Sequence, residues 1–158
     1  MRRRSRRHVL PGRRRLPHNH AVTVQVHPIR IKRVYEKPEA DDGARFLVDR
    51  LWPRGVKKEA LAIEAWLKDV APSNDLRHRY HHDLDQWDVF RRQYFNELGT
   101  QPDAWRPLVE AARKGTITLL FSSKEPAHNN AAALKEFLEL QLAGGTAHKR
   151  TKGSGRKS

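Results

Sequence analysis

The stretch TLLFSSKEPAHNNAAALKEFL, residues 118–138, decides the fold, because it holds a strand, a turn and a helix start in succession. Its apolar run ends at Ser122, and the polar turn that follows closes with two asparagines. Asparagine is favoured at helix N-termini, so Asn129 or Asn130 is expected to cap a helix. A buried strand that leads through a short turn into a helix is typical of an α/β domain.

The rest of the hydrophobic pattern supports this class. Three strands are expected, over residues 29–36, 45–52 and 116–121. The first alternates apolar and polar residues and is expected near a sheet edge, whereas the second is more continuously apolar and favours a central position. Helical spacing of apolar residues predicts several helices, among them 63–70 and 130–142. The order of elements predicts a small α/β fold whose sheet is largely parallel and packed with several helices.

The segment between the second and third strands is rich in tryptophan. Trp66, Trp87 and Trp105 fall on the apolar faces of expected helices, so they are expected in the core rather than as stacking platforms for bases. Ser73 precedes a short polar segment and is expected to cap a helix that runs to about Tyr80.

The charge of the chain is unevenly distributed. The 158 residues have the length of one domain and a formal net charge of +14. Residues 1–27 carry eight arginines and residues 143–158 carry five lysines and arginines, with no acidic residue in either segment. Residues 28–142 hold 19 basic and 18 acidic residues. Highly charged segments with few apolar residues cannot bury enough surface to fold. The prediction is therefore a disordered arginine-rich arm (1–27), an α/β domain (28–142) and a disordered basic tail (143–158).

The composition also excludes several classes of site. The chain has no cysteine, which rules out disulfides, cysteine-ligated metals and cysteine nucleophiles. No apolar run approaches the ~18–20 residues of a membrane span, and no secretory signal pattern follows the N-terminal arginines. A cytoplasmic protein without a membrane partner is expected. The sequence names no cofactor.

The first motif that can carry chemistry is VDRLWPRG, residues 48–55. It places Asp49 and Arg50 at the end of a buried strand, with Trp52 and Arg54 in the loop. Guanidinium groups match carboxylate and phosphate oxygens, so two arginines beside a rigid Trp-Pro suit a planar anion. The alternative is that Asp49 pairs with an arginine to hold the loop and that Trp52 fills the core.

The second motif is the turn after the strand 116–121. Its candidate ligand-binding residues are Ser122, Ser123, Lys124, Asn129 and Asn130. Lysine supplies a positive charge, the serines supply hydroxyls, and the helix N-terminus supplies free N–H groups for an anion. Glu125 and His128 can act as acid and base, and with Asp49 they are the catalytic candidates.

Both motifs follow strands, and the carboxyl ends of parallel strands meet at one edge of a sheet. The two loops bring Arg50, Arg54 and Lys124 together against only Asp49 and Glu125. This surplus of positive charge predicts one anion-binding cleft between the loops. In the alternative interpretation the two carboxylates neutralise two of the cations and the asparagines only cap the helix.

Four segments together resemble the YeaO-like branch of the bacterial domain-of-unknown-function family 488. They are IRIKRVYE, FLVDRLWPRG, WLKDVAPSNDLRHRYHHD and TLLFSSKEPAHNNAAALKEFL. The resemblance covers residues 29–140 and implies a small cytoplasmic α/β protein whose activity is not established. Other branches of that family carry Cys-His-Arg in the turn where this chain has His128, Asn129 and Asn130. Any cysteine chemistry of those branches therefore does not transfer.

The histidine-rich segment RHRYHHDLD, residues 77–85, is the third candidate. His78 and His82 are four residues apart and would share one helix face, with an aspartate to complete a metal site. The helix is expected to end near His82, which breaks this pairing, so no metal site is predicted. The resembled family carries His-Asp here too, which instead places His81, His82 and Asp83 near the ligand cleft.

Three functions remain open from the sequence. The first is a site for a small phosphate- or carboxylate-bearing ligand, with or without catalysis. The second is weak, non-specific association with nucleic acid through the basic ends of the chain. The third is a partner-binding module without chemistry of its own.

Overall fold

The sheet is fully parallel. The computed structural model describes residues 27–80 and 84–144, and the strands there lie in the order β1-β4-β2-β3. They are β1 (Ile29–Arg33), β2 (Ala44–Leu47), β3 (Ala65–Trp66) and β4 (Ile117–Phe121). The predicted parallel sheet is confirmed, with the first strand at an edge and the second inside.

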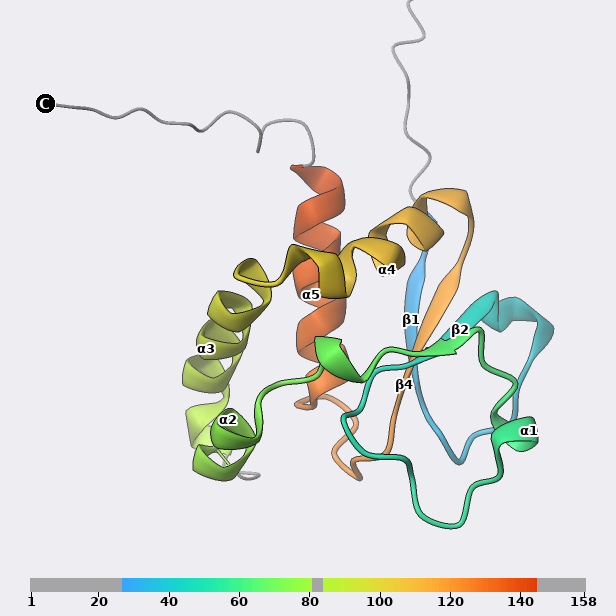
Figure 1. The fold of residues 1–158 in the computed structure, drawn as a ribbon, viewed down its shortest axis with the longest axis horizontal. Coiled ribbons are helices and arrows are strands. Elements are labelled where there is room, and N and C mark those ends of the chain that lie inside the picture. The colour runs from blue at the N-terminus through green and yellow to red at the C-terminus, as the bar shows by residue number, and fades with distance from the viewer. Residues whose placement is uncertain (1–26, 81–83, 145–158) are drawn as a thin grey trace, which may run out of the picture.

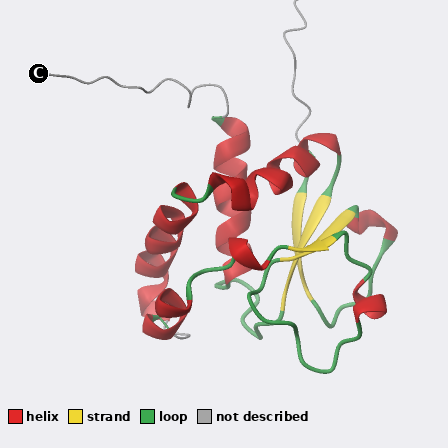
Figure 2. Cartoon of the chain, viewed as in Figure 1, coloured by secondary structure: helices red, strands yellow, loops and turns green. Residues whose placement is uncertain are grey.

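The helices lie mainly on one side of this sheet. They are α1 (Lys58–Leu61), α2 (Asn74–Arg79), α3 (Trp87–Gly99), α4 (Pro102–Lys114) and α5 (Asn130–Ala143), with 3-10 turns η1 (Ala40–Asp42), η2 (Lys68–Val70) and η3 (Leu84–Gln86). Figures 1 and 2 show α3, α4 and α5 together on one side, whereas α1 and long loops lie on the other.

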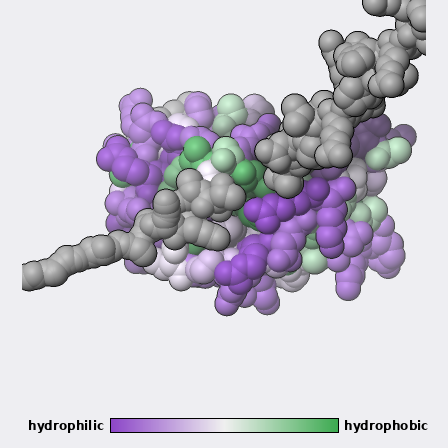
Figure 3. Space-filling model, turned by 90° about the horizontal axis from the view of Figure 1, so that it is seen from above, coloured by the Kyte–Doolittle hydropathy of each residue, from purple (hydrophilic) through white to green (hydrophobic). Residues whose placement is uncertain are grey.

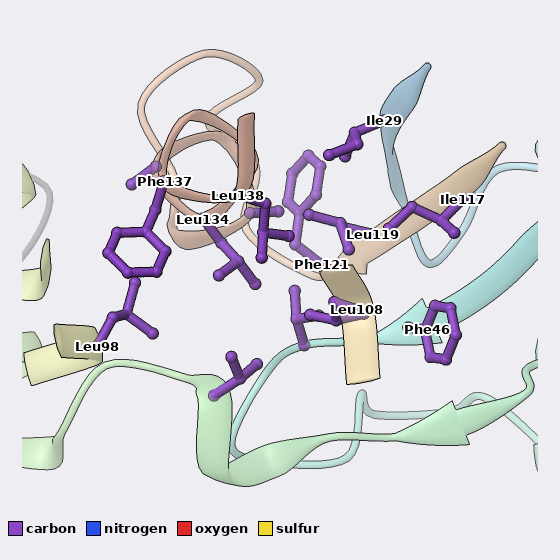
Figure 4. Packing of buried hydrophobic residues seen from close by; sticks show 14 of the residues in the cluster. Ile29, Phe46, Leu98, Leu108, Ile117, Leu119, Phe121, Leu134, Phe137 and Leu138 are labelled. Carbon is purple, nitrogen blue, oxygen red and sulfur yellow. The ribbon is translucent and has the colours of Figure 1, made fainter. Parts of the chain in front are cut away.

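The main core forms between the sheet and α5. Side chains alternate across a strand, so every second residue of β1 and β4 faces the helices. Figure 4 shows these side chains meeting one face of α5; they are Ile29, Ile117, Leu119 and Phe121 from the sheet and Leu134, Phe137 and Leu138 from the helix. Burial of each such side chain stabilises the fold by about 1.5–3 kcal/mol. This core fixes the direction of α5 and therefore the position of the turn before it.

The second face of the sheet is divided. Its carboxyl half carries a smaller apolar cluster of Val34, Leu47, Leu61 and Leu120. Beside it, the nearly buried charged side chains of Lys32 in β1 and Arg45 in β2 pair with Asp42 in η1, which has no exposed surface. Loops and α1 cover this face.

The predicted helix over residues 63–70 is wrong. The segment instead forms β3 and η2, because its backbone pairs with β2: Glu64 N–H donates to Arg45 O at 2.7 Å and Leu67 N–H to Leu47 O at 2.9 Å. Sheet pairing overrides the helical spacing of its apolar residues. Trp66, expected in the core, is 36% exposed on the edge strand.

Other local predictions hold. Trp87 and Trp105 are partly buried against the main core. Ser73 caps α2 by accepting a 3.1 Å hydrogen bond from Leu76 N–H, and Asn129 caps α5 by accepting one of 2.8 Å from Ala132 N–H. None of the helices in the described ranges is long and apolar enough to cross a membrane. The predicted arm and most of the predicted tail lie outside the described residues.

Candidate functional site

The two motif loops meet at the carboxyl edge of the sheet. The first edge loop (residues 48–57) follows β2 and the second edge loop (residues 122–129) follows β4. Because β2 and β4 are parallel neighbours, both loops leave the sheet at the same end. In Figure 1 the first edge loop runs along the bottom of the sheet, where the strands end.

Asp49 joins the two edge loops. One carboxylate oxygen accepts hydrogen bonds from Ser122 N–H at 2.9 Å and from its hydroxyl at 2.7 Å. The other oxygen accepts one of 3.0 Å from the side-chain amide of Asn130, which also donates to Val48 O at 3.2 Å. Both oxygens are therefore engaged by donors of the protein itself, and no arginine forms an ion pair with Asp49 within the described residues.

The second edge loop is held by its own polar side chains. Ser123 Oγ accepts from Glu125 N–H at 3.1 Å, and a Glu125 oxygen accepts from Ala127 N–H at 3.0 Å and His128 N–H at 3.3 Å. The Asn129 amide donates to Glu125 O at 2.8 Å. The side chains of Ser123, Glu125 and Asn129 thus shape the loop itself, and ligand binding by the serines and asparagines stays a prediction.

Arg50 and Trp52 also have structural partners. The Arg50 guanidinium donates to Ala71 O at 3.0 Å and to Pro72 O at 3.3 Å, so it ties the first edge loop to the segment after η2. Trp52 is partly buried, its indole N–H donates to Val56 O at 2.7 Å, and its ring meets Trp66 edge-on at 5.4 Å. Trp52 acts as a plug under the loop, as the alternative interpretation expects.

Arg54 and Lys124 are the candidates that stay available to a ligand. Both side chains are exposed. Neither they nor Arg50 forms an ion pair with any residue of the described ranges. The carboxylates of Asp49 and Glu125 accept hydrogen bonds from N–H and O–H groups and form no ion pair with these cations.

Arg33, the last residue of β1, is a part of the site that the sequence analysis missed. Its guanidinium donates to Ser123 O at 2.9 Å and to Ser122 O at 3.1 Å, and lies 5.0 Å from the ring centre of Tyr35. The Tyr35 hydroxyl in turn donates to Arg54 O at 3.3 Å. Arg33 therefore links both edge loops. Its position at the end of a parallel strand was the signal that could have identified it.

Glu125 and His128 lie together at the start of α5. His128 Nδ1 is 4.0 Å from a Glu125 carboxylate oxygen, and its ring lies 4.9 Å from that of Trp87. His128 is more than a third exposed, at 39% for its side chain. Asp49 has other partners, Ser122 and Asn130.

The histidine-rich segment is only partly visible. His81, His82 and Asp83 lie outside the described residues, so their placement near the ligand site stays a prediction. Residues 27–80 and 84–144 contain no group of three side chains that could hold a metal ion. The prediction that His78 and His82 form no metal site involves an undescribed residue and is likewise untested.

Two hollows lie between η2 and the start of α4. The larger, of about 390 Å³, is lined by Asp69 and by residues 100–104. The smaller, of about 230 Å³, extends from there along residues 66–70 to Pro107. Neither of these two hollows is lined by Arg33, Arg54 or a residue of the second edge loop.

Comparison with known proteins gives matches to a family and to uncharacterised relatives. A family model described as "Inactive DUF488-N3 subclade" matches residues 28–155. The chain is 43% identical over 110 residues to the uncharacterized protein YeaO of Escherichia coli (strain K12), which covers 70% of this chain and 96% of that protein. It is 38% identical to the uncharacterized protein Rv3073c of Mycobacterium tuberculosis (strain H37Rv), over 70% and 92% of the two chains. No solved structure matches.

Proposed function

Because the chain belongs to the inactive DUF488-N3 subclade, we propose that it is a non-catalytic protein that binds an anionic ligand at the carboxyl edge of its sheet. The ligand presents phosphate or carboxylate oxygens to Arg54, Lys124 and Arg33. The family is described as inactive, which favours binding over catalysis for this chain.

The observation that carries the proposal is how the charges at this edge are partnered. Asp49 and Glu125 accept hydrogen bonds from backbone N–H groups and from neutral side chains. Arg33 and Arg50 donate to backbone carbonyls, and Arg54 and Lys124 are exposed. The cations are thus held in place without ion pairs among the described residues. An anion supplied from outside would complete them.

The surrounding backbone favours the same charge. α5 begins directly behind the second edge loop, and the N-terminus of a helix carries partial positive charge. Exposed charges at such a position gain about 0.3–1 kcal/mol from the helix. Asn129 caps only the N–H of Ala132, so the helix end adds a modest contribution to that of the side chains.

The candidate catalytic groups support binding rather than chemistry. The carboxylate of Asp49 accepts three hydrogen bonds from Ser122 and Asn130, so it already serves as a structural acceptor between the edge loops and α5. His128 rests against Trp87 and Glu125 holds the turn. Each of the three has a structural role that the fold needs without a substrate.

Phosphate-dependent thermal stabilisation tests the proposal. At a phosphate concentration about ten times the dissociation constant, binding stabilises the folded state by about 1.4 kcal/mol. This corresponds to a rise of roughly 3–8 °C in the unfolding temperature. Sodium chloride at matched ionic strength gives the baseline, and Arg54→Ala and Lys124→Ala should each remove most of the extra rise.

Lys114→Ala is the matched control. Lys114 is an exposed lysine at the end of α4, next to the amino end of β4, so it lies away from the edge loops. Phosphate also stabilises proteins by exclusion from their surfaces, and Lys114→Ala measures that general effect. An equal phosphate response in Lys124→Ala, Arg54→Ala and Lys114→Ala would disprove anion binding at the edge.

A further inference from the structure

We propose that the anion at the carboxyl edge is part of an acidic peptide segment of another protein, which docks across the first edge loop through Tyr35, Leu51 and Trp66 and pairs with the neighbouring cations. The inference rests on the proposed anion binding and specifies that the ligand is a peptide. The partner segment carries aspartate or glutamate beside an apolar side chain.

The first observation is where the exposed apolar side chains lie. The large hydrophobic residues exposed in the described ranges are Tyr35 (54%), Leu51 (65%), Trp66 (36%) and Leu140 (54%). Single exposed hydrophobics are common on folded proteins. Here, however, Tyr35 follows β1, Leu51 follows β2 and Trp66 ends β3, so three strands each present one at the carboxyl edge.

The second observation is that the first edge loop joins these side chains into one strip. Trp66 donates through its indole N–H to Asp49 O at 2.7 Å, and its ring meets that of Trp52 at 5.4 Å. At the other end of the loop, Tyr35 donates to Arg54 O at 3.3 Å. Leu51 belongs to the same loop, between Asp49 and Trp52 along the chain, and is 65% exposed.

Cations lie beside two of the apolar residues of this strip. The guanidinium of Arg33 lies 5.0 Å from the Tyr35 ring centre, and the ammonium of Lys68 lies 5.2 Å from that of Trp66. Arg54 stands beside Tyr35. Tyrosine, tryptophan and arginine are the residue types that contribute most to protein–protein binding. The surface therefore complements a partner that brings carboxylates and an apolar anchor together.

The opposite end of the molecule shows why both features are needed. Seen from above, apolar side chains also gather near the middle of that surface (Figure 3). Leu140, near the end of α5, is as exposed as Tyr35, at 54% for each. No cation–π pair of the described residues involves this end of α5. Apolar exposure alone therefore does not distinguish the two ends, whereas the cations over the rings of Tyr35 and Trp66 are a feature of the carboxyl edge.

A peptide fits this surface better than other anions. Small ligands favour enclosed pockets, and the hollow of about 390 Å³ and its smaller neighbour lie between η2 and α4 rather than over Leu51 or Arg54. Nucleic-acid bases stack on aromatic faces. One face of Tyr35 and one of Trp66 are already covered by Arg33 and Lys68, and Leu51, the most exposed of the three, offers no ring.

Peptide selection on the full-length chain tests the inference. A random 12-residue peptide library is presented to the immobilised protein, with excess polyglutamate to remove peptides held by charge alone. We expect enriched peptides that combine acidic residues with an aliphatic or aromatic residue. In fluorescence-polarisation titrations of one such peptide, Leu51→Ser and Arg54→Ala should each weaken binding about tenfold or more. Leu140→Ser, the matched exposed leucine, should leave it unchanged.

The outcomes separate the inference from the proposed function. If phosphate stabilises the protein but no acidic peptide is enriched, or if Leu51→Ser binds as wild type does, the inference is overturned and small-anion binding stands. If Arg54→Ala changes neither the phosphate-dependent stabilisation nor the affinity for the peptide, both the inference and the proposed function are overturned. A single-stranded dT oligonucleotide that displaces the peptide and loses affinity in Tyr35→Ala and Trp66→Ala would assign the strip to nucleic acid instead.

Discussion

Two groups of charged side chains show how differently this fold treats the same residue types. The buried cluster consists of Asp42 with Lys32, Arg45, Arg30 and Glu39, on the second face of the sheet. The edge cluster consists of Asp49 with Arg33, Arg50, Arg54 and Lys124. Each has an aspartate among several cations, yet only the first forms ion pairs within the described residues.

The partners of the two aspartates explain the difference. Asp42 accepts from Arg45 at 2.6 Å, from Lys32 at 3.1 Å and from Glu39 N–H at 3.0 Å, with no exposed surface. Its cations balance it inside the protein. Asp49 accepts hydrogen bonds from Ser122 and Asn130, and it does not pair with the cations of the edge cluster. The hydrogen-bond partners of a charged residue therefore determine whether it stabilises the fold or is available to a ligand, and its residue type alone does not.

Replacing the two aspartates should give the largest difference. Asp42→Ala leaves Arg45, at 4% exposure, buried without a carboxylate and leaves Lys32, at 6%, with Glu39 alone, and should lower the free energy of unfolding by about 3–5 kcal/mol. Asp49→Ala breaks hydrogen bonds to Ser122 and Asn130 but buries no unpaired cation, so a loss of about 1–3 kcal/mol is expected. Urea denaturation measures both.

Asp103→Ala serves as the reference for this pair. Asp103 forms an ion pair with Arg106 on the surface, where its side chain is 91% exposed, and such pairs contribute about 0–1 kcal/mol. If Asp42→Ala costs no more than Asp49→Ala, the buried cluster is not held by its charges and the contrast between the two clusters fails.

The loss of stability at acid pH should be the second difference between the two clusters. Burial by itself raises the pKa of Asp42, but hydrogen bonds from Glu39 N–H, Lys32 and Arg45 outweigh it and hold this pKa below its ordinary value of 3.8. The stability it contributes is therefore fully present above pH 3.8 and is lost as the pH falls through the folded-state value.

Urea denaturation at several pH values from about 6 to about 2 measures this contribution. Wild type should lose stability more steeply below pH 3.8 than Asp42→Asn, in which the titrating carboxyl is gone. Parallel curves for the two proteins would show that Asp42 does not carry the acid sensitivity. Asp49→Asn provides the comparison from the edge cluster.

Much of the fold could be predicted from hydrophobic pattern because most elements are stabilised locally. The strand before Ser122 and the helix after Asn129 have clear periodicity and a capping residue, and both were placed correctly. Residues 63–70 misled because their apolar spacing suits a helix, whereas hydrogen bonds to Arg45 and Leu47 in β2 decide their structure. Such pairing depends on residues distant in sequence, and a local pattern cannot contain it.

For the site, the location could be predicted but the roles of the side chains could not. Parallel strands bring the two edge loops together, and this followed from the order of elements. Whether Asn130 faces a ligand or Asp49 depends on side-chain geometry, as does the engagement of Arg50 with two carbonyls. The alternating pattern of β1 assigns no role to Arg33, because its contacts with Ser122 and Ser123 arise from the pairing of β1 with β4.

The smallest expected effect concerns Arg50, which combines a structural role, as in the buried cluster, with a position in the edge cluster. It belongs to the edge cluster, but its guanidinium holds the carbonyls of Ala71 and Pro72 as a fixed structural clamp. Arg50→Lys keeps the positive charge and loses the planar fork, so the free energy of unfolding should fall by about 1 kcal/mol. Phosphate-dependent stabilisation should persist, because Arg54 and Lys124 remain. Arg106→Lys, at an exposed surface pair, gives the baseline for such a change. The opposite result would be unchanged stability in Arg50→Lys together with a lost phosphate response. It would show that the guanidinium of Arg50 binds the anion and does not stabilise the fold.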